Sequence, residues 1–412
     1  MNSATLRIAA ALSTQEITTL AVAEACDKVV AGLREGSDSV HADLVLLFVS
    51  PHHVEQLATA AQTICDRLGT TALIGCSGES IVGTRTEVED APALSLWAAR
   101  LPGTAVVPMR LEFERTPEGG TFSGWPENGD ELAADGATLI LLGEPFSFPA
   151  DSLLERFNED LPGFAVVGGM ASGGWQPGTN RVVLGTEVFD SGASAVLVYG
   201  GVQVRSVVSQ GCRPIGQPMV VTRSQQNVLQ ELGGKPALDQ LKALWPTLDD
   251  HDRQLAQRGL HLGLAMNEYV ESFQRGDFLI RNVTGVDPDQ GMIAIGDFVR
   301  TGQTVQFHLR DAASADEELA ELVAHAEVQQ PVPPAGALLF TCNGRGTRLF
   351  DAPHHDAGAI AETFGSLPLA GFFAQGEIGP VAGKNFLHGF TASVVFFESP
   401  AAAELESTDE RQ

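Results

Sequence analysis

The sequence predicts an α/β protein in which repeated strand-helix-strand-strand units form mixed, largely parallel sheets in two domains packed face to face. One observation is that continuous apolar runs, such as DLVLLFVS at 43–50, are typical of strands buried on both faces of a sheet. A second is that each of these runs precedes a segment with helical spacing and then a glycine-rich turn. The same order of segments occurs three times, which indicates an internal repeat.

The first copy of this repeat begins with the strand at 43–50. Pro51 starts a predicted helix, because the missing proline N–H costs nothing in the first turn, and Gly69 ends it. Residues 71–83 (TALIGCSGESIVG) predict a strand that runs into a glycine-rich turn, and residues 93–99 predict a closing strand.

Two further copies follow the same order. The second comprises a strand at 136–143, a helix near 151–160, a glycine-rich segment at 164–174 and a strand at 193–199. The third comprises a strand at 336–342, a helix near 356–364, a glycine-rich segment at 367–380 and a strand at 391–397. Each strand-helix-strand step predicts two parallel strands joined by a right-handed crossover.

The stretch between the second and third copies has a different pattern. Residues 201–212 alternate like a half-exposed strand, and residues 221–245 suggest two helices separated at Gly233-Gly234. Residues 278–299 predict a hairpin around an Asp-Pro-Asp-Gln-Gly turn, and residues 315–328 an amphipathic helix. The acidic tail at 399–412 is expected to be disordered.

Composition restricts the function. The chain has 412 residues, with 25 Lys and Arg against 52 Asp and Glu, a formal net charge of −27. Because 44% of the residues are hydrophobic, this acidity lies on a globular protein and not on a disordered acidic chain. A strongly negative surface repels phosphates, so we expect no nucleic-acid partner and no binding to anionic membranes.

The sequence also leads us to expect no targeting segment. No apolar stretch approaches the length of a transmembrane helix, and the N-terminal apolar run fits a first strand better than a signal peptide. The five cysteines are widely spaced, without a C-x-x-C pair, so no disulfide framework is expected. These features predict a cytoplasmic protein.

Several segments resemble the FIST family. The resemblance rests on IGCSGESIVG at 74–83, TCNGRG at 341–346, AGFFAQGEIGP at 370–380 and HGFTASVVFF at 388–397, with GDFLIRNVTGVD and FHLRDA between them. It implies an N-terminal FIST domain at 1–200 and a C-terminal FIST domain at 201–398. It also implies an intracellular sensory module for a small ligand, with amino acids as candidates. Because the chain carries no F-box, methyl-acceptor, cyclase or kinase segment, a signal would have to pass through an unknown protein partner, or the role is not signalling.

The glycine-rich turns are the candidate ligand site. Open α/β sheets bind ligands outside the carboxyl ends of their strands, where glycine N–H groups can approach an anion. The alternative is that the glycines only turn the chain and let strands pack closely. The candidate ligand-binding residues are Gly75, Cys76, Ser77, Gly78, Glu79, Gly168, Gly169, Asn343, Gly344, Arg345, Gly346, Gly371, Phe372, Phe373, Gln375, Gly376 and Glu377.

Two residue types give this site its expected chemistry. Arg345 would take a ligand carboxylate in a bidentate contact, unless it forms a salt bridge with one of the many acidic residues. Glu79 and Glu377 are interpreted as equivalent positions of two copies. They would receive a ligand ammonium, or act as acid and base if one is desolvated, or else cap a helix N-terminus or bond to turn amides. Phe372 and Phe373 would help to line an apolar wall.

Catalysis is the alternative function. Cys342 and Cys76 follow strands beside glycine turns, where amides can lower a thiol pKa, so a transferase or hydrolase could use either one. A buried, unreactive thiol is the simpler interpretation. The doublets His52-His53 and His354-His355 lack a second ligand at helical spacing, so no metal is expected. No cofactor is expected either, since Leu349 replaces the third glycine of a dinucleotide motif and no P-loop is present.

Overall fold

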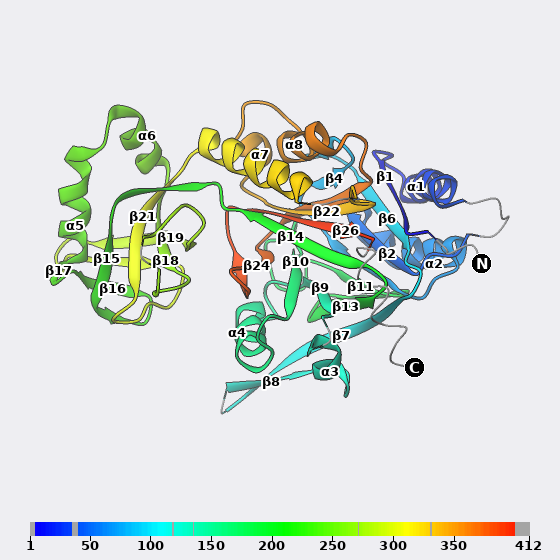
Figure 1. The fold of residues 1–412 in the computed structure, drawn as a ribbon, viewed down its shortest axis with the longest axis horizontal. Coiled ribbons are helices and arrows are strands. Elements are labelled where there is room, and N and C mark those ends of the chain that lie inside the picture. Colours follow the sequence, from blue (N-terminus) through cyan, green and yellow to red (C-terminus); the bar gives the residue numbers. More distant parts are fainter. Residues whose placement is uncertain are drawn as a thin grey trace. The chain divides into compact units, whose positions relative to one another are not determined.

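The computed structural model describes residues 5–34, 40–117, 119–134, 136–270, 272–329 and 332–399, so the predicted tail lies outside the described residues except for Ser399. The chain divides into two compact units (Figure 1). The larger contains Met1–Val208, Ala320–Leu387 and Thr391–Gln412, and the smaller contains Ser209–Leu319 and His388–Phe390. The division into sequence domains at residue 200, and their packing face to face, stay predictions.

The larger unit contains the predicted repeat, with each copy extended by an earlier strand and helix. The first copy is β1 (Arg7–Ser13), α1 (Thr18–Leu33), β2 (Leu44–Val49), the 3-10 helix η1 (Pro51–Gln56), α2 (Leu57–Leu68), β3 (Leu73–Ser77), β4 (Ile81–Gly83), β5 (Thr86–Val88) and β6 (Leu94–Arg100).

The other two copies follow the same plan. The second is β7 (Thr104–Thr116), β8 (Gly119–Ser123), α3 (Gly129–Ala134), β9 (Thr138–Gly143), α4 (Ala150–Asp160), β10 (Ala165–Met170), β11 (Val182–Leu184), β12 (Glu187–Phe189) and β13 (Ala193–Gly200). The third is β14 (Gln203–Ser209), α7 (Ala312–Val328), β22 (Gly336–Cys342), the 3-10 helix η3 (Gly346–Arg348), α8 (His355–Phe364), β23 (Leu369–Ala374), β24 (Glu377–Val381), β25 (Lys384–His388) and β26 (Ala392–Glu398). The smaller unit is thus inserted between β14 and the later elements of the third copy.

The sheets are mixed, but the expectation that they are largely parallel is wrong. Each of the three sheets of the larger unit has one parallel pair, namely β2/β3, β9/β10 or β22/β23, as the strand-helix-strand steps predict. The closing strands β6, β13 and β26 return antiparallel beside β2, β9 and β22. In all three copies the closing strand lies between the first strand and the strand after the first helix. In the first two copies these two outer strands run in the same direction, because the closing strand pairs antiparallel with both of them.

Each sheet is completed by a hairpin from another copy. The first copy's hairpin β4–β5 pairs with β23 of the third copy, and the second copy's hairpin β11–β12 pairs with β3 of the first. The third copy's hairpin β24–β25 pairs with β10 of the second, which closes a ring of exchanges. The three copies therefore cannot fold as independent sheets.

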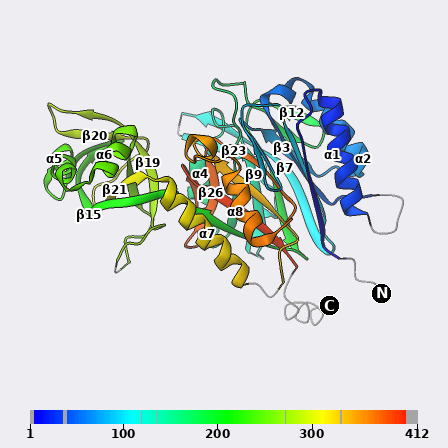
Figure 2. The same cartoon turned by 90° about the horizontal axis from the view of Figure 1, so that it is seen from above.

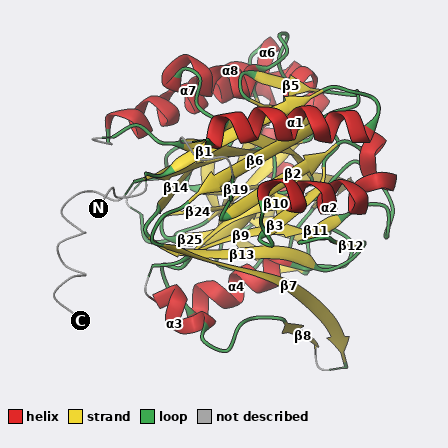
Figure 3. Ribbon diagram, turned by 90° about the vertical axis from the view of Figure 1, so that its right-hand side faces the viewer, coloured by secondary structure: helices red, strands yellow, loops and turns green. Residues whose placement is uncertain are grey.

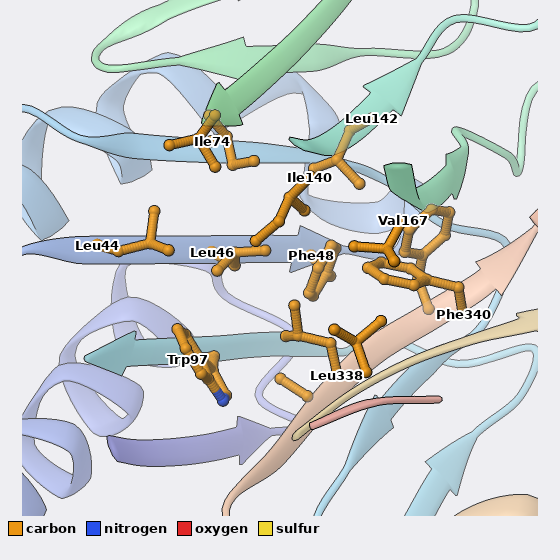
Figure 4. Packing of buried hydrophobic residues seen from close by; sticks show 14 of the residues in the cluster. Leu44, Leu46, Phe48, Ile74, Trp97, Ile140, Leu142, Val167, Leu338 and Phe340 are labelled. Atoms are coloured by element: carbon orange, nitrogen blue, oxygen red, sulfur yellow. The ribbon is translucent and has the colours of Figure 1, made fainter. Parts of the chain in front are cut away.

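Both faces of the repeated strands are buried, which explains their continuous apolar runs. Leu46 and Phe48 of β2 point into a central core, to which all three sheets contribute side chains (Figure 4). Val45 and Leu47 alternate with them and pack beneath α1 and α2 on the outer face of the first sheet (Figures 2 and 3). Burial on both faces at period two thus fixes the register of each strand.

The smaller unit is a closed sheet with three helical segments and residues 312–319 of α7. Its elements are β15 (Cys212–Gln225), β16 (Val228–Leu232), β17 (Lys235–Pro236), α5 (Ala237–Leu244), the 3-10 helix η2 (Trp245–Thr247), α6 (Asp250–Arg258), β18 (Leu260–Ala265), β19 (Phe278–Asp287), β20 (Met292–Ile295) and β21 (Thr304–Arg310). The order β15-β21-β18-β19-β20-β16 closes because β16 also pairs with β15.

One helix predicted in this region is wrong. Residues 221–232 form a hairpin between β15 and β16, in which Gln226 adopts a positive φ of 53° at the turn. Burial of Val221, Leu229 and Leu232 in the core of the smaller unit outweighs the weak helical spacing. The predicted second helix is present as α5, the predicted hairpin as β19–β20, and the predicted amphipathic helix as α7.

Candidate functional site

Three equivalent glycines relate the copies to one another. A Cβ on Gly75, Gly168 or Gly371 would overlap a backbone carbonyl oxygen of the neighbouring parallel strand. Only glycine allows the two strands to approach so closely at these positions. For these three residues the geometry shows the strand-packing role that the sequence left as an alternative to ligand binding.

This correspondence corrects one interpretation of the sequence. When the copies are aligned on Gly75 and Gly371, the residue of the third copy that matches Glu79 is Gln375. Glu79 and Glu377 are therefore not equivalent. The exchanged hairpins give the true equivalents of Glu377. Glu377 pairs with Gly169, Ile81 with Phe372, and Val182 with Cys76, and these three partners hold the same position in their strands. The third copy therefore carries a glutamate where the others carry aliphatic residues.

Glu377 is fully buried at the start of β24. Its Oε2 accepts hydrogen bonds from the Thr391 backbone N at 3.1 Å and from Thr391 Oγ1 at 2.8 Å. Its Oε1 has no hydrogen-bond partner among the described residues. Burial raises the pKa of this carboxyl to about 8, since the Thr391 bonds and the charge of Arg345 offset only part of the desolvation.

Arg345 lies in the loop after β22 and is also fully buried. Its Nε and Nη2 donate to the two carboxylate oxygens of Asp356 at 2.8 and 2.7 Å, and Thr341 Oγ1 donates to Asp356 Oδ2 at 2.6 Å. Burial alone would raise the pKa of Asp356, but the Arg345 charge and these hydrogen bonds lower it well below its usual range. Of the two roles considered for Arg345, the structure shows the salt bridge, and Nη1 is the one guanidinium nitrogen without a partner among the described residues.

The loop between β22 and α8 is tied to the first copy. Arg348 donates from Nη1 to the Asn343 carbonyl oxygen at 2.9 Å and from Nη2 to Glu79. Thr347 donates from its backbone N and its Oγ1 to the Glu89 carboxylate at 3.0 and 2.7 Å. Within the described ranges, Glu79 Oε2 and Asn343 Oδ1 are buried atoms without a hydrogen-bond partner.

Ser172 of the second copy contacts both the first and the third copy near this loop. Its Oγ accepts a hydrogen bond from the Glu79 backbone N at 2.7 Å and donates to the Phe373 carbonyl oxygen. Asn343 N donates to the Ala374 carbonyl oxygen at 3.0 Å. Segments of all three copies therefore meet at the carboxyl ends of β22 and β23.

A second buried glutamate lies behind Arg345. Glu87 of β5 accepts a hydrogen bond at Oε1 from the Ala357 backbone N at 2.8 Å, and its backbone N donates to His354 Nδ1 at 3.0 Å. Burial and the neighbouring Asp356 charge raise the pKa of Glu87 to about 8. Its Oε2 has no hydrogen-bond partner in the part of the chain that the structure describes.

The equivalent strand end of the second copy is fully bonded. There Glu144 is buried, and its Oε2 accepts from Phe146 N at 3.0 Å, from Ser147 N at 2.9 Å and from Ser147 Oγ at 2.7 Å. Its Oε1 accepts from Asn180 Nδ2 at 3.3 Å. A carboxylate at a strand end can thus be satisfied by this fold, and the third copy differs in leaving charged groups with unused bonding capacity.

Several residues predicted to contact a ligand lie in the core. Cys76 and Phe372 belong to the central core, and the Phe372 ring stacks on Phe48 with 5.2 Å between ring centroids. Burial raises the pKa of the Cys76 thiol well above its ordinary value, which disfavours a thiolate there. Cys342 is half-buried, and its Sγ accepts a hydrogen bond from Gly344 N at 3.5 Å.

The histidine doublets lie at the starts of the helices η1 and α8. His53 is buried, with 3.0 Å between its Nδ1 and Thr18 Oγ1, and the His355 ring stacks on Phe350 with 3.3 Å between ring centroids. Among the described residues, no three or more His, Cys, Asp or Glu side chains form a group that could hold a metal ion.

The sequence reasoning missed the residues that hold the charged groups in place. Four of these were not predicted as site residues. Asp356 bonds to Arg345, Thr341 bonds to Asp356, Thr391 bonds to Glu377, and Ser172 bonds to Glu79. The signal that could have found Thr341 and Thr391 is the internal repeat. Alignment on Gly75, Gly168 and Gly371 places polar residues of the third copy against apolar residues of the others.

Comparison with known proteins identifies two matched regions. Residues 43–235 match the model of the FIST N domain, and residues 237–380 match that of the FIST C domain. An uncharacterized protein of Mycobacterium tuberculosis (strain ATCC 25618 / H37Rv) is 43% identical over 392 residues, which cover 95% of this chain and 100% of the relative. An uncharacterized protein of Mycobacterium bovis is 44% identical over 354 residues, 86% of this chain and 90% of the relative.

A plant protein shares part of the chain. An F-box/LRR-repeat protein of Arabidopsis thaliana is 24% identical over 208 residues, 48% of this chain and 37% of its own length.

In the described part of this chain, every helix is too short or too polar to cross a membrane.

Proposed function

The chain belongs to the FIST family, and we propose that it is a cytoplasmic sensory protein that binds a small metabolite, such as an amino acid, at the carboxyl ends of β22 and β23. FIST domains are generally thought to be small-ligand-binding sensory domains. The ligand signal would be passed to a protein partner. A FIST-like region also forms part of a larger F-box/LRR-repeat protein, which supports a role alongside other modules.

The observation that carries the proposal is the departure of the third copy from the other two. Glu377 replaces Ile81 and Val182, and Thr341 replaces Val49 and Gly143. An unpartnered buried carboxyl destabilises a fold, so its presence at one of three equivalent positions indicates a role in function.

The available bonding groups suit a zwitterion. Arg345 Nη1 is a donor that can meet a carboxylate oxygen, and Glu377 Oε1 is an acceptor that can meet an ammonium group. Arg345 is held rigidly by Asp356, so a ligand would meet a preorganised donor. The backbone N–H groups of the loop from Asn343 to Gly346 are further candidates for ligand contact, because this loop adjoins both charged residues.

Thermal-shift screening against amino acids and small polar metabolites, followed by calorimetry of the hits, tests the proposal. We expect a hit to raise the melting temperature of the wild-type protein and to bind more weakly when Arg345→Lys removes the fixed guanidinium geometry. A screen without any stabilising metabolite would contradict the proposal. So would a ligand whose affinity is unchanged by Arg345→Lys and by Asn343→Ala.

A cysteine-dependent transferase or hydrolase is the alternative, and Cys342 is the residue that favours it. Cys342 is half-buried at the end of β22, and its charge would interact with that of Arg345. Thiol reactivity near neutral pH that is abolished by Cys342→Ser would support an enzyme. An unreactive thiol would argue strongly against it.

A further inference from the structure

This inference rests on the function proposed above and names the chemistry of the ligand. We propose that the site recognises a protonated amine, that Glu377 is the counter-ion of this amine, and that a ligand carboxylate contributes less to affinity. Amines that lack a carboxylate would therefore also bind, with an affinity similar to that of the amino acid.

The unused bonding atoms at the site are mainly acceptors. Glu79 Oε2 and Asn343 Oδ1 are acceptors, Glu377 Oε1 and Glu87 Oε2 become acceptors when these carboxyls lose their protons, and Arg345 Nη1 is a donor. None of these five atoms has a hydrogen-bond partner within the described ranges. An ammonium group offers three donors and no acceptor, so it complements such a set. A carboxylate offers only acceptors and would leave most of these atoms unsatisfied.

The charges around the site favour the same sign of ligand. The acidic side chains here are Glu79, Glu89 and Asp356, together with Glu87 and Glu377, which their raised pKa values keep largely protonated until a bound cation favours their ionised form. The basic side chains are Arg345 and Arg348. Both arginines already form ion pairs, with Asp356 and Glu79 respectively. The whole chain adds a formal charge of −27, so its field attracts cations and repels anions.

Among these acidic side chains, Glu87, Glu89 and Glu377 have no cationic hydrogen-bond partner in the described residues. Glu79 pairs with Arg348, Glu89 accepts from Thr347, and Glu87 accepts from the first turn of α8. Thr391 holds Oε2 of Glu377, and Oε1, which has no hydrogen-bond partner among the described residues, is left to a ligand.

Thr391 belongs to the same departure from the repeat. Its carbonyl oxygen accepts from Cys342 N at 3.0 Å, as the carbonyl oxygens of Ala93 and Gly192 accept from Ser50 and Glu144 in the other copies. Where those copies carry Ala and Gly, the third copy carries a hydroxyl that binds Glu377. The carboxyl and the group that orients it therefore occur together in the copy that we assign to ligand binding.

A matched ligand series tests this inference. L-Alanine, L-alaninamide and L-lactate have the same size and differ in whether they carry the ammonium group, the carboxylate or both, and the leucine and phenylalanine series repeat the comparison for larger sites. Binding of each compound is measured by thermal shift and calorimetry for the wild type, for Glu377→Gln and for Glu318→Gln.

Glu318→Gln is the control, because Glu318 is a buried carboxylate of the smaller unit that accepts hydrogen bonds from Ser209, Gln210 and Gly211. Circular dichroism shows whether each variant is folded, and Glu377→Asp, which keeps the charge, provides a second test.

We expect the amino acid and its amide to bind within about tenfold of each other, and the hydroxy acid not to bind. We expect Glu377→Gln to weaken amine binding about tenfold to a hundredfold, as the loss of a charged hydrogen bond does. We expect Glu377→Asp to restore part of this binding and Glu318→Gln to leave it unchanged.

Two results would overturn the inference. If hydroxy acids bind as tightly as the amines, or if Glu377→Gln leaves amine binding unchanged, the amine assignment is wrong while the protein remains a metabolite sensor. If no compound of the series and no metabolite of the broader screen binds, the proposed function itself is wrong, and this inference falls with it.

Discussion

Arg345 and Asp356 form a bidentate ion pair in which the guanidinium is fully buried and the carboxylate is 1% exposed. The pair joins the loop after β22 to the first turn of α8 and fixes the position of Arg345 Nη1. Removing one member would leave an uncompensated charge in the interior, which is far more costly than exposing a surface charge.

We therefore expect Asp356→Asn to lower the free energy of unfolding by about 3–5 kcal/mol. Urea denaturation, followed by circular dichroism, measures this change. Exchange of the surface residue Asp160, which pairs with Arg156 on the exposed face of α4, is the control and should cost under about 1 kcal/mol. An Asp356→Asn variant as stable as the control would show that the pair is not buried as described.

Rebuilding the first copy's residues in the third copy should stabilise the protein. Glu377→Ile combined with Thr391→Ala removes a buried carboxyl that lacks a partner at Oε1 and restores the residues found at Ile81 and Ala93. The expected gain is about 1–3 kcal/mol, observed as a rise in melting temperature of about 2 °C or more. Calorimetry should show this gain together with the loss of amine binding, and a variant that melts earlier would contradict the assigned equivalence.

The raised pKa of Glu377 predicts a dependence of stability on pH. In the unfolded chain the carboxyl loses its proton above its ordinary pKa of 4.5, whereas in the folded protein it keeps the proton up to about 8. Between these values the folded state binds more protons, so this group's contribution to stability falls as pH rises, by at most about 1.4 kcal/mol per pH unit.

The variant Glu377→Gln isolates this effect, since Glu87 has a similar raised pKa and is present in both proteins. We expect the melting temperature of Glu377→Gln, relative to the wild type, to be higher at pH 8.5 than at pH 5.5. Thermal melts over this range measure the difference. A difference that stays constant with pH would mean that Glu377 is already ionised in the folded protein at pH 5.5.

The close approach of the repeated strands can be tested at Gly371. A Cβ there would overlap the Leu339 carbonyl oxygen, so Gly371→Ala should destabilise the protein by more than about 2 kcal/mol. A Cβ on Gly358 of α8 would meet no other atom within 4 Å among the described residues, so Gly358→Ala should instead be neutral or stabilise the helix by up to about 1 kcal/mol. Chemical denaturation should show a clear loss of stability for Gly371→Ala and no loss for Gly358→Ala.

Much of the local structure could be predicted because it follows from burial. The run at 43–50 is apolar on both faces since Leu46 packs into the central core and Leu47 beneath the helices. The exchange of hairpins could not be predicted, because the pattern around Ile81 is the same whichever sheet its strand joins. The partner of that strand, β23, is distant in the sequence and is selected only by tertiary packing.

The candidate site shows the same division. Arg345 was recognisable as an unusual cation beside a glycine turn, but its partner Asp356 lies at the start of a helix, where an acidic residue is ordinary. Glu377 was recognised as a candidate, yet its alignment with Glu79 was wrong, because two short Gly-Glu pairs matched better than the glycines that the strand packing requires. Burial of Glu377, which sets its chemistry, is visible only in the folded chain.

A crystal structure of the protein with L-alaninamide, or with the larger amide that binds more tightly, tests the central claim most directly. We predict that the ligand's ammonium nitrogen lies within hydrogen-bonding distance of Glu377 Oε1, at the carboxyl ends of β22 and β23. A ligand bound elsewhere in the protein, or one that turns its ammonium group away from Glu377, would contradict the account.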